Sequence, residues 1–507
     1  MGQVTYRGNL SSKTFPFISE NFGRTIIVPQ YDQTYVRNVL DPQDPDKDVG
    51  IPQMYYCHNV MPHSAGVQSV SYTQLIADVP GVTDFSSIQI LRDSSDNRAF
   101  LGLKTNGDFY ICNGTGGPWV FKQAGVAGKL VTIAYVAGIT YIYVENTGCY
   151  KYDFSTGAFV SVTLTGLVVA NVTGITYSAG YLVAWTKTTV SWSSTIDPTD
   201  FVPSLNTGAG GGAVESARGA INYCLPHLLG FIVGTASNCV VALYQNNSRY
   251  PFQFREIVNS GGLTSLELID TDPNSSNLYS YTTSGMQLIS STQTQTVFPE
   301  LTDFISGRYF EDFDDSTKTF ITTTLSTAMK KKLVIVADRY LVISYGINEL
   351  THAIVYDFTL KRYGKLKFTH VDCFDYQIPT AGILETPRQS LAFLTKTGSV
   401  SVVDFSIAGE NSNGTMILGK YQFVRPRLLQ LDEVSLESTR QAQTFNLTIL
   451  PSLDGKNWVL SDPALVYSEG LTRTYQMRDV GKNISLLCQG GFVMESIILT
   501  FNIDSKR

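Results

Sequence analysis

One short unit recurs along the middle of this 507-residue sequence: a polar turn followed by a strand-like segment of alternating hydrophobicity. Most copies also have a strand-like segment just before the turn, as in ITYIYVE (139–145) and YLVISYG (340–346). Strand, tight turn and strand together are typical of a β-hairpin. The copies are TNGDFYIC from Thr105, NTGCYKYD from Asn146, KTTVSWSS from Lys187, ASNCVVAL from Ala236, TSGMQLIS from Thr283, ELTHAIVYDF from Glu349 and KTGSVSVVDF from Lys396.

The spacing of these hairpins indicates a fold. β-Propellers repeat every ~40–50 residues, one repeat per blade. The interval from Gly107 to Gly148 and the interval from Asn238 to Gly285 both match one such repeat. The sequence therefore predicts a mainly β protein with a β-propeller of six to eight blades over residues 84–410. Two stacked β-sandwiches are the alternative.

The interval from Gly285 to Thr351 is longer than one blade repeat. We interpret residues 297–332 as an insertion between blades, with a short helix over 301–305 behind Pro299. An acidic run is expected to project from a loop of this insertion, and it stands out as a candidate functional feature. Its members are Glu311, Asp312, Asp314 and Asp315. The basic run 330–332 is expected to be a solvated turn.

The two ends of the chain differ from the middle. Residues 411–507 contain long alternating segments such as FNLTILPS and NISLLCQG, and the pair Asp454–Gly455 is a hairpin signal. They predict a C-terminal antiparallel β-sandwich that serves as a platform. Residues 1–83 are predicted to form an extended N-terminal arm and part of this platform, since LDPQDPDKDVGIP (40–52) is rich in proline and acidic residues.

Composition restricts the class of protein. Charged residues make up 16% of the chain, below the ~25% of average globular chains, and aromatic residues make up 12%. A net charge of −6 argues against tight binding of nucleic acid by counterion release. The seven cysteines are scattered without a CxxC pair and are predicted to be buried free thiols of a cytosolic product. The N-terminus lacks the apolar core of a signal peptide, and no apolar run approaches the ~20 residues of a membrane span.

No motif for catalysis or cofactor binding stands out. The glycine-rich stretch 206–219, NTGAGGGAVESARG, matches a loose dinucleotide fingerprint, but no strand precedes it and no carboxylate follows ~20 residues on. We interpret it as a connection between blades. Cys57, His58 and His63, or His370, Asp372 and Cys373, do not have the spacing of zinc ligands. The sequence therefore predicts no enzyme activity, no cofactor and no metal.

Five segments in order along nearly the whole chain resemble the tail nozzle proteins (tail hub or DNA-stabilisation proteins) of short-tailed bacteriophages. These are YYCHNVMPHSAGVQSVSYT (55–73), VSWSSTIDPTDFVPS (190–204), DRYLVISYG (338–346), VYDFTLKRYGKLKFTHVDCF (355–374) and DVGKNISLLCQGGFVMESIILTF (479–501). Each segment alone is weakly specific, and the set of five is more specific.

The resemblance implies a propeller flanked by a platform built from both ends of the chain. It implies a hexameric ring in the virion tail, assembled in the host cytoplasm, that contacts adaptor or portal-proximal proteins and tail fibres. Such a ring closes the tail and lets DNA pass without sequence-specific binding. In such a ring, the acidic run 311–315 is a candidate for lining the channel, and a solvated outer loop is the alternative. The alternative is a propeller that binds or cleaves glycans as a receptor-binding tail component. Tyr141, Tyr143, Trp185 and Trp192 could line its pocket, but their alternating spacing favours packing between blades.

Overall fold

The computed structural model shows an all-β architecture over the residues that it describes. These are residues 2–9, 25–28, 54–63, 66–77, 81–113, 117–247, 249–271, 277–282, 285–299, 309–317, 319–324, 329–336, 339–378, 388–403, 405, 413–423, 429–437, 445–453, 465–467, 473–481, 483–494 and 496–503. Two 3₁₀-helices, η2 (Val169–Asn171) and η3 (Leu266–Leu268), interrupt the strands. In these ranges no helix is long and apolar enough to cross a membrane.

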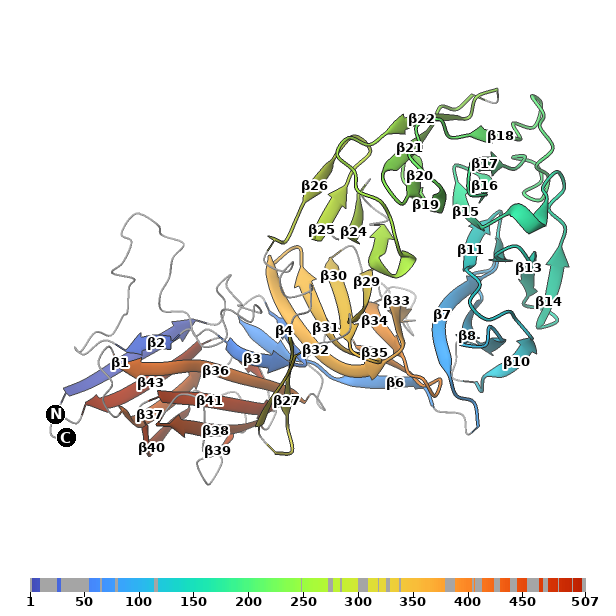
Figure 1. Ribbon diagram of the computed structural model, residues 1–507. Helices are drawn as coiled ribbons and strands as arrows, with labels where there is room; N and C mark the ends of the chain where they lie inside the picture. Colours follow the sequence, from blue (N-terminus) through green and yellow to red (C-terminus); the bar gives the residue numbers. More distant parts are fainter. Residues whose placement is uncertain are drawn as a thin grey trace.

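In the described part of the chain, seven antiparallel sheets of four or more strands follow one another along residues 85–403 (Figure 1). The first contains β7 (Phe85–Arg92), β8 (Arg98–Lys104), β9 (Phe109–Asn113) and β10 (Val120–Gln123). The second contains β11 (Val131–Val136), β12 (Ile139–Val144), β13 (Gly148–Asp153) and β14 (Ala158–Val162). The third contains β15 (Gly174–Ser178), β16 (Tyr181–Trp185), β17 (Thr189–Trp192) and β18 (Gly210–Ala213). The fourth contains β19 (Ile221–His227), β20 (Gly230–Thr235), β21 (Cys239–Tyr244) and β22 (Phe252–Glu256).

The remaining three sheets continue the series. The fifth contains β23 (Ile269–Thr271), β24 (Leu278–Thr282), β25 (Gly285–Ile289) and β26 (Thr294–Thr296). The sixth contains β29 (Lys330–Val336), β30 (Tyr340–Gly346), β31 (Leu350–Asp357) and β32 (Arg362–His370). The seventh contains β33 (Asp372–Ile378), β34 (Arg388–Leu394), β35 (Val400–Val403) and β6 (Tyr72–Ile76).

The hairpins predicted from the repeat are confirmed as the second and third strands of each sheet. In the second sheet, for example, Val144 pairs with Gly148 across the turn that contains Asn146. Asn146 has a φ of 53°, and Gly107 in the first sheet has a φ of 88°. Asparagine and glycine tolerate this left-handed conformation better than other residues do, which explains why the repeat is marked by them.

Apolar side chains fill the spaces between consecutive sheets. Leu101 of the first sheet and Ile142 of the second belong to one buried cluster. Similar clusters lie between each later pair, and a further one joins Ala392 of the seventh sheet to Phe100 of the first. The first strands of most neighbouring sheets also touch, including β33 of the seventh sheet and β7 of the first. These antiparallel sheets are consistent with propeller blades.

The strand β6 comes from the segment that the sequence assigns to the arm and platform. Its residues pair with β35, with Tyr72 opposite Val403 and Ile76 opposite Val400. The seventh sheet is thus completed by a strand from near the beginning of the chain. Pairing with β6 covers the edge of β35, which would otherwise expose unpaired backbone groups.

Both ends of the chain enter one pair of packed sheets (Figure 1). One sheet has the order β1 (Gly2–Asn9), β43 (Ser496–Ile503), β37 (Leu429–Glu437) and β40 (Arg473–Gly481). The other contains β2 (Thr25–Val28), β36 (Gly414–Phe423), β41 (Asn483–Gly490), β38 (Phe445–Ser452) and β39 (Leu465–Tyr467), and β3 (Met54–His58) also pairs with β36. Val434 and Leu499 of the first sheet share a buried cluster with Leu447 and Leu486 of the second.

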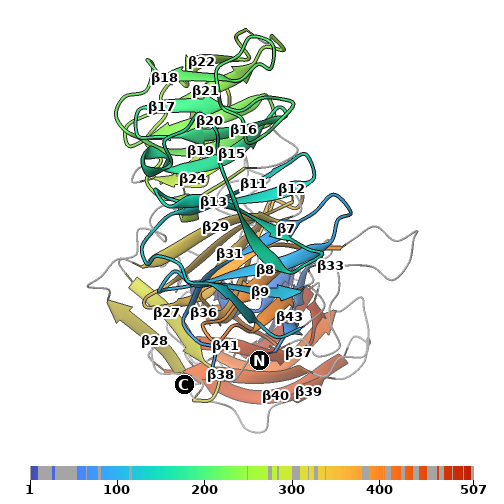
Figure 2. The same cartoon turned by 90° about the vertical axis from the view of Figure 1, so that its right-hand side faces the viewer.

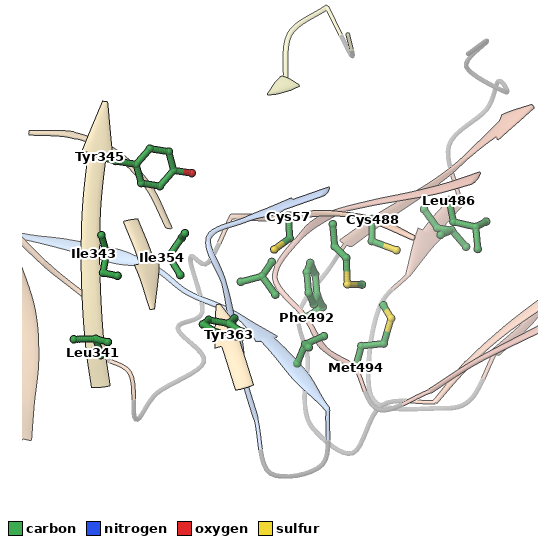
Figure 3. Packing of buried hydrophobic residues seen from close by; sticks show 14 of the residues in the cluster. Cys57, Leu341, Ile343, Tyr345, Ile354, Tyr363, Leu486, Cys488, Phe492 and Met494 are labelled. Atoms are coloured by element: carbon green, nitrogen blue, oxygen red, sulfur yellow. The ribbon is translucent and has the colours of Figure 1, made fainter. Parts of the chain in front are cut away.

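The sixth sheet joins these two terminal sheets to the rest of the molecule. Beyond β32 it continues through β4 (Val60–Pro62), β5 (Val67–Ser69) and β42 (Val493–Met494). Figure 3 shows the apolar cluster at this point, where Ile354 and Tyr363 of the sixth sheet and Cys488 of β41 contribute to one core. Because this core is continuous, the sixth sheet and the terminal sheets are packed together rather than connected only by the chain.

Several predicted features lie outside the described residues. They are the helix over 301–305, the turn at Asp454–Gly455 and the segment 40–52.

Candidate functional site

The acidic run of the insertion lies in a β-hairpin, which corrects the prediction of a projecting loop. The hairpin consists of β27 (Tyr309–Asp314) and β28 (Thr319–Thr324), and among the described residues these strands pair only with each other. Asp314 ends β27 and its carboxylate accepts hydrogen bonds from the backbone N–H and the hydroxyl of Ser316 at 2.8 and 2.6 Å. These hydrogen bonds lower the pKa of Asp314 to about 2. Asp314 therefore stabilises the turn of the hairpin.

Asp312 is held by two side chains of the sixth sheet. Its Oδ1 lies 2.8 Å from Nζ of Lys367 on β32 and 3.1 Å from Nε2 of His352 on β31. Lys367 also donates to the carbonyl oxygen of Phe313 at 2.8 Å, and the Phe313 side chain is buried. Burial alone would raise the pKa of Asp312, but the hydrogen bond from His352 and the charge of Lys367 lower it well below its usual range. Asp312 is therefore a paired carboxylate.

Asp315 makes the corresponding contacts with the terminal sheets. Its Oδ2 lies 2.9 Å from Nε2 of His58 on β3. Its Oδ1 accepts hydrogen bonds from Thr415 Oγ1 on β36 at 2.8 Å and from Gln489 Nε2 on β41 at 2.9 Å. Burial raises the pKa of Asp315, and the hydrogen bond and charge of His58 more than offset this, so that the net shift is downward. The hairpin is thus fastened to both parts of the molecule at their junction.

These contacts reduce the charge that the run can present to a ligand. Asp312 and Asp315 are occupied by groups of the same chain, whereas Asp314 is bound by its own turn. The backbone of Glu311 lies in β27, opposite Thr322. A channel-lining role for Glu311, Asp312, Asp314 and Asp315 stays a prediction. No local pattern indicates that this run meets two histidines and a lysine, since those residues lie on strands far away in the sequence.

Three distant segments build the junction that the hairpin covers. Val60 on β4 pairs with Lys365 on β32, and Gln68 on β5 pairs with Val493 on β42. The chain passes from the terminal sheets into the sixth sheet at Asn59, which has a φ of 54°. The Asn59 side chain accepts hydrogen bonds from the backbone N–H of Lys367 at 2.9 Å and from the hydroxyl of Tyr72 at 2.7 Å. Asn59 therefore fixes the crossing point of the chain.

The glycine-rich stretch is partly a turn and partly a strand. Residues 210–213 form β18, the outer strand of the third sheet, so the interpretation as a simple connection is wrong for this half. Gly208 has a φ of 74°, and its carbonyl oxygen accepts a hydrogen bond from Trp192 Nε1 at 2.9 Å. A side chain at Gly211 would meet Ser191 on the neighbouring strand. Glycine is required here by close packing of backbone rather than by a phosphate.

The basic run is also not a solvated turn. Lys330, Lys331 and Lys332 begin β29. Lys332 forms an ion pair with the buried carboxylate of Asp372 on β33, and Asp372 also accepts a hydrogen bond from the backbone N–H of Ile88 on β7 at 2.8 Å. Asp372 therefore links the sixth, seventh and first sheets.

The described residues contain no group of three or more metal-ligating side chains. Of the two sets weighed from the sequence, His58 contacts Asp315 as described above. His370 is buried, with Nδ1 2.6 Å from the carbonyl oxygen of Phe368 and Nε2 3.0 Å from Ser344 Oγ. All seven cysteines are buried and free, as predicted. Burial raises the pKa of Cys57 and Cys149 to about 12, which makes their thiols unreactive.

Three of the four aromatic residues of the glycan-binding alternative are buried in the core. Tyr141, Tyr143 and Trp185 are buried in the cores between sheets, and Trp192 is half-buried over Gly208. An open depression of about 330 Å³ lies elsewhere, where the first, second and seventh sheets meet. It is lined by Ile88, Gln89, Ile90, Arg92, Ile133, Tyr135, Thr140 and Phe374. This lining includes no carboxylate and therefore no acid–base pair for glycoside cleavage.

Comparisons with known proteins give no family. No protein-family model matches the chain, and no curated protein matches it. Among solved structures, a chain of the "Crystal Structure of Mitotic Checkpoint Complex" is similar with a TM-score of 0.36 and 11% identity, over 64% of this chain and 93% of that one. The computationally designed Ika8 protein is similar with a TM-score of 0.37 and 10% identity, over 66% of this chain and 99% of that one.

Proposed function

We propose that this chain is a structural protein of a short-tailed bacteriophage virion, of the tail-nozzle type. In this proposal it assembles into a hexameric ring that closes the tail, retains the packaged DNA and conducts it during ejection. The role is mechanical, with no enzyme activity and no cofactor. Its partners are other copies of the chain, adaptor or portal-proximal tail proteins, tail fibres and the passing DNA.

The observation that carries the proposal is the meeting of three resembling segments at one place. Residues 55–73, 355–374 and 479–501 are far apart in the sequence, yet they supply β4 and β5, β32, and β42 of the extended sixth sheet. Ser69 on β5 and Phe492 just before β42 bond reciprocally there: the Ser69 backbone N–H donates to the Phe492 carbonyl oxygen at 2.9 Å, and the Phe492 backbone N–H donates to Ser69 Oγ at 2.8 Å. A resemblance that is spread along the chain thus corresponds to one structural unit, the connection between sheets and platform.

The proposal includes a finer description of the architecture. The seven sheets of residues 84–410 form a closed seven-bladed propeller, within the predicted range of six to eight blades. The contact of β33 with β7 and the apolar cluster between the seventh and first sheets support this closure. Residues 411–507, together with strands from residues 1–83, form a β-sandwich platform, which is supported by the pairing of β1 with β43.

The net negative charge of the chain agrees with a channel through which DNA passes. The chain has a net charge of −6, so a ring of identical copies carries a large negative charge. Negative charge repels DNA phosphates within a Debye length of ~8 Å, whereas clustered lysines would retain the duplex. Sliding of DNA therefore requires no specific contact.

Native mass spectrometry of the purified full-length protein, with electron microscopy of the same sample, tests the proposal. We expect a species of six copies with a central opening. A protein that stays monomeric at all concentrations would contradict the ring. A monomer that binds an oligosaccharide would instead favour the glycan-binding alternative, which no observation on the described residues supports at present.

A further inference from the structure

An apolar surface lies at the end of the molecule that is farthest from the terminal sheets. It consists of the connection between β17 and β18 (193–209) and of the neighbouring β19–β20 turn and β21–β22 connection of the fourth sheet. In Figures 1 and 2, β18 and β22 lie at the opposite end of the molecule from β37 and β40. We call it the outer-loop surface. Its exposed large apolar side chains are Ile196, Val202, Leu205, Leu228, Leu229, Tyr244 and Tyr250.

The exposure of these side chains is large. Ile196 is 80% exposed, Leu205 and Leu228 are each 66% exposed, and Tyr250 is 64% exposed. Apolar residues are common on protein surfaces as single positions, but a group of them marks an interaction site. The outer-loop surface is such a group.

The 193–209 connection is held in a fixed shape by its own hydrogen bonds. Ser194 Oγ accepts the backbone N–H of Ile196 at 3.0 Å, and Asp200 Oδ1 accepts the backbone N–H of Val202 at 2.9 Å. The backbone N–H of Phe201 donates to Thr165 of the preceding connection at 2.8 Å, and the Phe201 side chain is buried between the second and third sheets. Its exposed aliphatic side chains are therefore presented without a further loss of backbone entropy on binding.

The two halves of the surface are neighbours. Trp192, which precedes the 193–209 connection, packs edge-on against Phe252 of β22 with ring centroids 5.4 Å apart. The backbone N–H of Tyr244 donates to the carbonyl oxygen of Leu229 at 2.8 Å, which places the turn and the connection of the fourth sheet together. The third-sheet half and the fourth-sheet half thus form one surface.

The two halves carry opposite charge. The third-sheet half includes Asp197 and Asp200, and the fourth-sheet half includes Arg249, which lies over the Tyr250 ring at 5.5 Å. Among the described residues none of these three charged groups forms an ion pair. Each half therefore combines apolar side chains with charged groups that have no ion-pair partner in the described part of the chain. The third-sheet half is acidic and the fourth-sheet half is basic, so each half carries the charge that could pair with the other.

We propose that the outer-loop surface binds a second copy of this chain in a two-fold arrangement. A two-fold axis places the acidic third-sheet half of one copy against the basic fourth-sheet half of the other, and the reverse contact is then made as well. Ile196 and Leu205 of one copy pack against Leu228 and Tyr250 of its partner. The contact doubles the mass of the particle whether the single unit is a monomer or the proposed ring, so it does not depend on the ring.

Analytical ultracentrifugation of full-length variants tests the pairing. We expect Ile196→Ser to raise the dissociation constant of the doubled species about tenfold, since truncation of a central apolar contact has effects of this size. Val480→Ser is the matched control, because Val480 is also exposed but lies on β40 of the terminal sheets. Equal association of both variants and the wild type, or a wild-type protein without a doubled species, would overturn the proposal.

A charge cycle tests the relative orientation of the two copies. Arg249→Glu places a third negative group against Asp197 and Asp200 of the partner. We expect roughly fivefold weaker association, and this weakening should be largest at low salt. Asp197→Asn with Asp200→Asn keeps the side-chain oxygens that cap the loop and removes the charge. Adding both to Arg249→Glu should recover most of the lost association. No recovery would exclude the two-fold arrangement.

Discussion

Asp312 shows how the expected role of a single residue changes once its neighbours in the structure are known. In the sequence it is one of four carboxylates in a short run, whereas in the structure it accepts from Lys367 and His352. An isolated acidic run favours a solvated loop, and pairing with residues on other strands has no signal in the local pattern. The same holds for Lys332, whose partner Asp372 lies on a strand of the next sheet.

Replacement of Asp312 should release the hairpin. Asp312→Ala removes the carboxylate that Lys367 and the buried His352 contact, and we expect a loss of about 2 kcal/mol in the free energy that holds the hairpin in place. Faster hydrogen exchange of the β27 and β28 amides would report this. Asp312→Asn retains one accepting oxygen and should have a smaller effect. Unchanged exchange in the alanine variant would show that the contacts of Phe313 and Asp315 are sufficient to anchor the hairpin.

Two buried histidines predict a pH dependence of stability. Burial lowers the pKa of His352 to about 4 and that of His370 to about 3, below the ~6.5 of an unfolded chain. At these two sites the unfolded state binds protons that the native state does not bind, so their contribution to stability is complete above pH 6.5 and falls as the pH decreases towards 4. Asp270, whose pKa is raised to about 6 by burial, contributes in the opposite direction. Each histidine contributes at most ~1.4 kcal/mol per pH unit to the slope of the free energy of unfolding against pH.

Denaturant unfolding at pH values between 6.5 and 5 measures this slope. His370→Gln should decrease it, because one of the buried neutral histidines that take up a proton on unfolding is then absent. The interval above pH 5 is chosen because most carboxylates of the unfolded chain are still ionised there. If the slope of the free energy of unfolding against pH does not change in the variant, His370 is not a source of the proton uptake on unfolding.

The position of the strand β6 is one that the sequence did not predict. The sequence places Tyr72–Ile76 in the arm and platform, because the first seventy residues are irregular and include a segment rich in proline and acidic residues. Its partner β35 lies near the other end of the chain, and pairing of such distant strands is determined by the closure of the sheets. The hairpins, by contrast, have their partner strands close by in the sequence and their turns marked by asparagine or glycine.

Ile76 should therefore contribute more to the stability of the fold than its place in a short strand suggests. It is buried in the cluster between the seventh and first sheets, and Ile76→Ala removes apolar contacts and leaves a cavity. We expect a loss of about 3 kcal/mol in the free energy of unfolding. Thr73→Ala on the same strand is exposed and should change stability by less than ~0.5 kcal/mol. Similar losses for the two variants in denaturant unfolding would argue against closure through β6.

For the assembled molecule, the proposed conduit makes a prediction about DNA release. Neutralising all four acidic residues would also break the ion pair of Asp312, so we restrict the change to Glu311→Gln and Asp314→Asn. If the run faces the channel, DNA release from assembled particles should be altered, and most strongly at low salt where screening is weakest. Asp96→Asn, in an exposed turn of the first sheet, is the control. Unchanged DNA release at low salt would contradict a position of the hairpin in the channel wall.

The amino-acid sequence alone was sufficient to predict the β class, the seven hairpins and their spacing, and the burial of the cysteines. These features depend on residues close together in the chain: alternation on a strand, and asparagine or glycine where φ is positive. Long-range packing determines which strand completes the seventh sheet, that the acidic run is a paired hairpin, and that segments 55–73, 355–374 and 479–501 meet. Those features depend on contacts between residues far apart in the chain, and such contacts form only when the packing of the sheets brings the strands together.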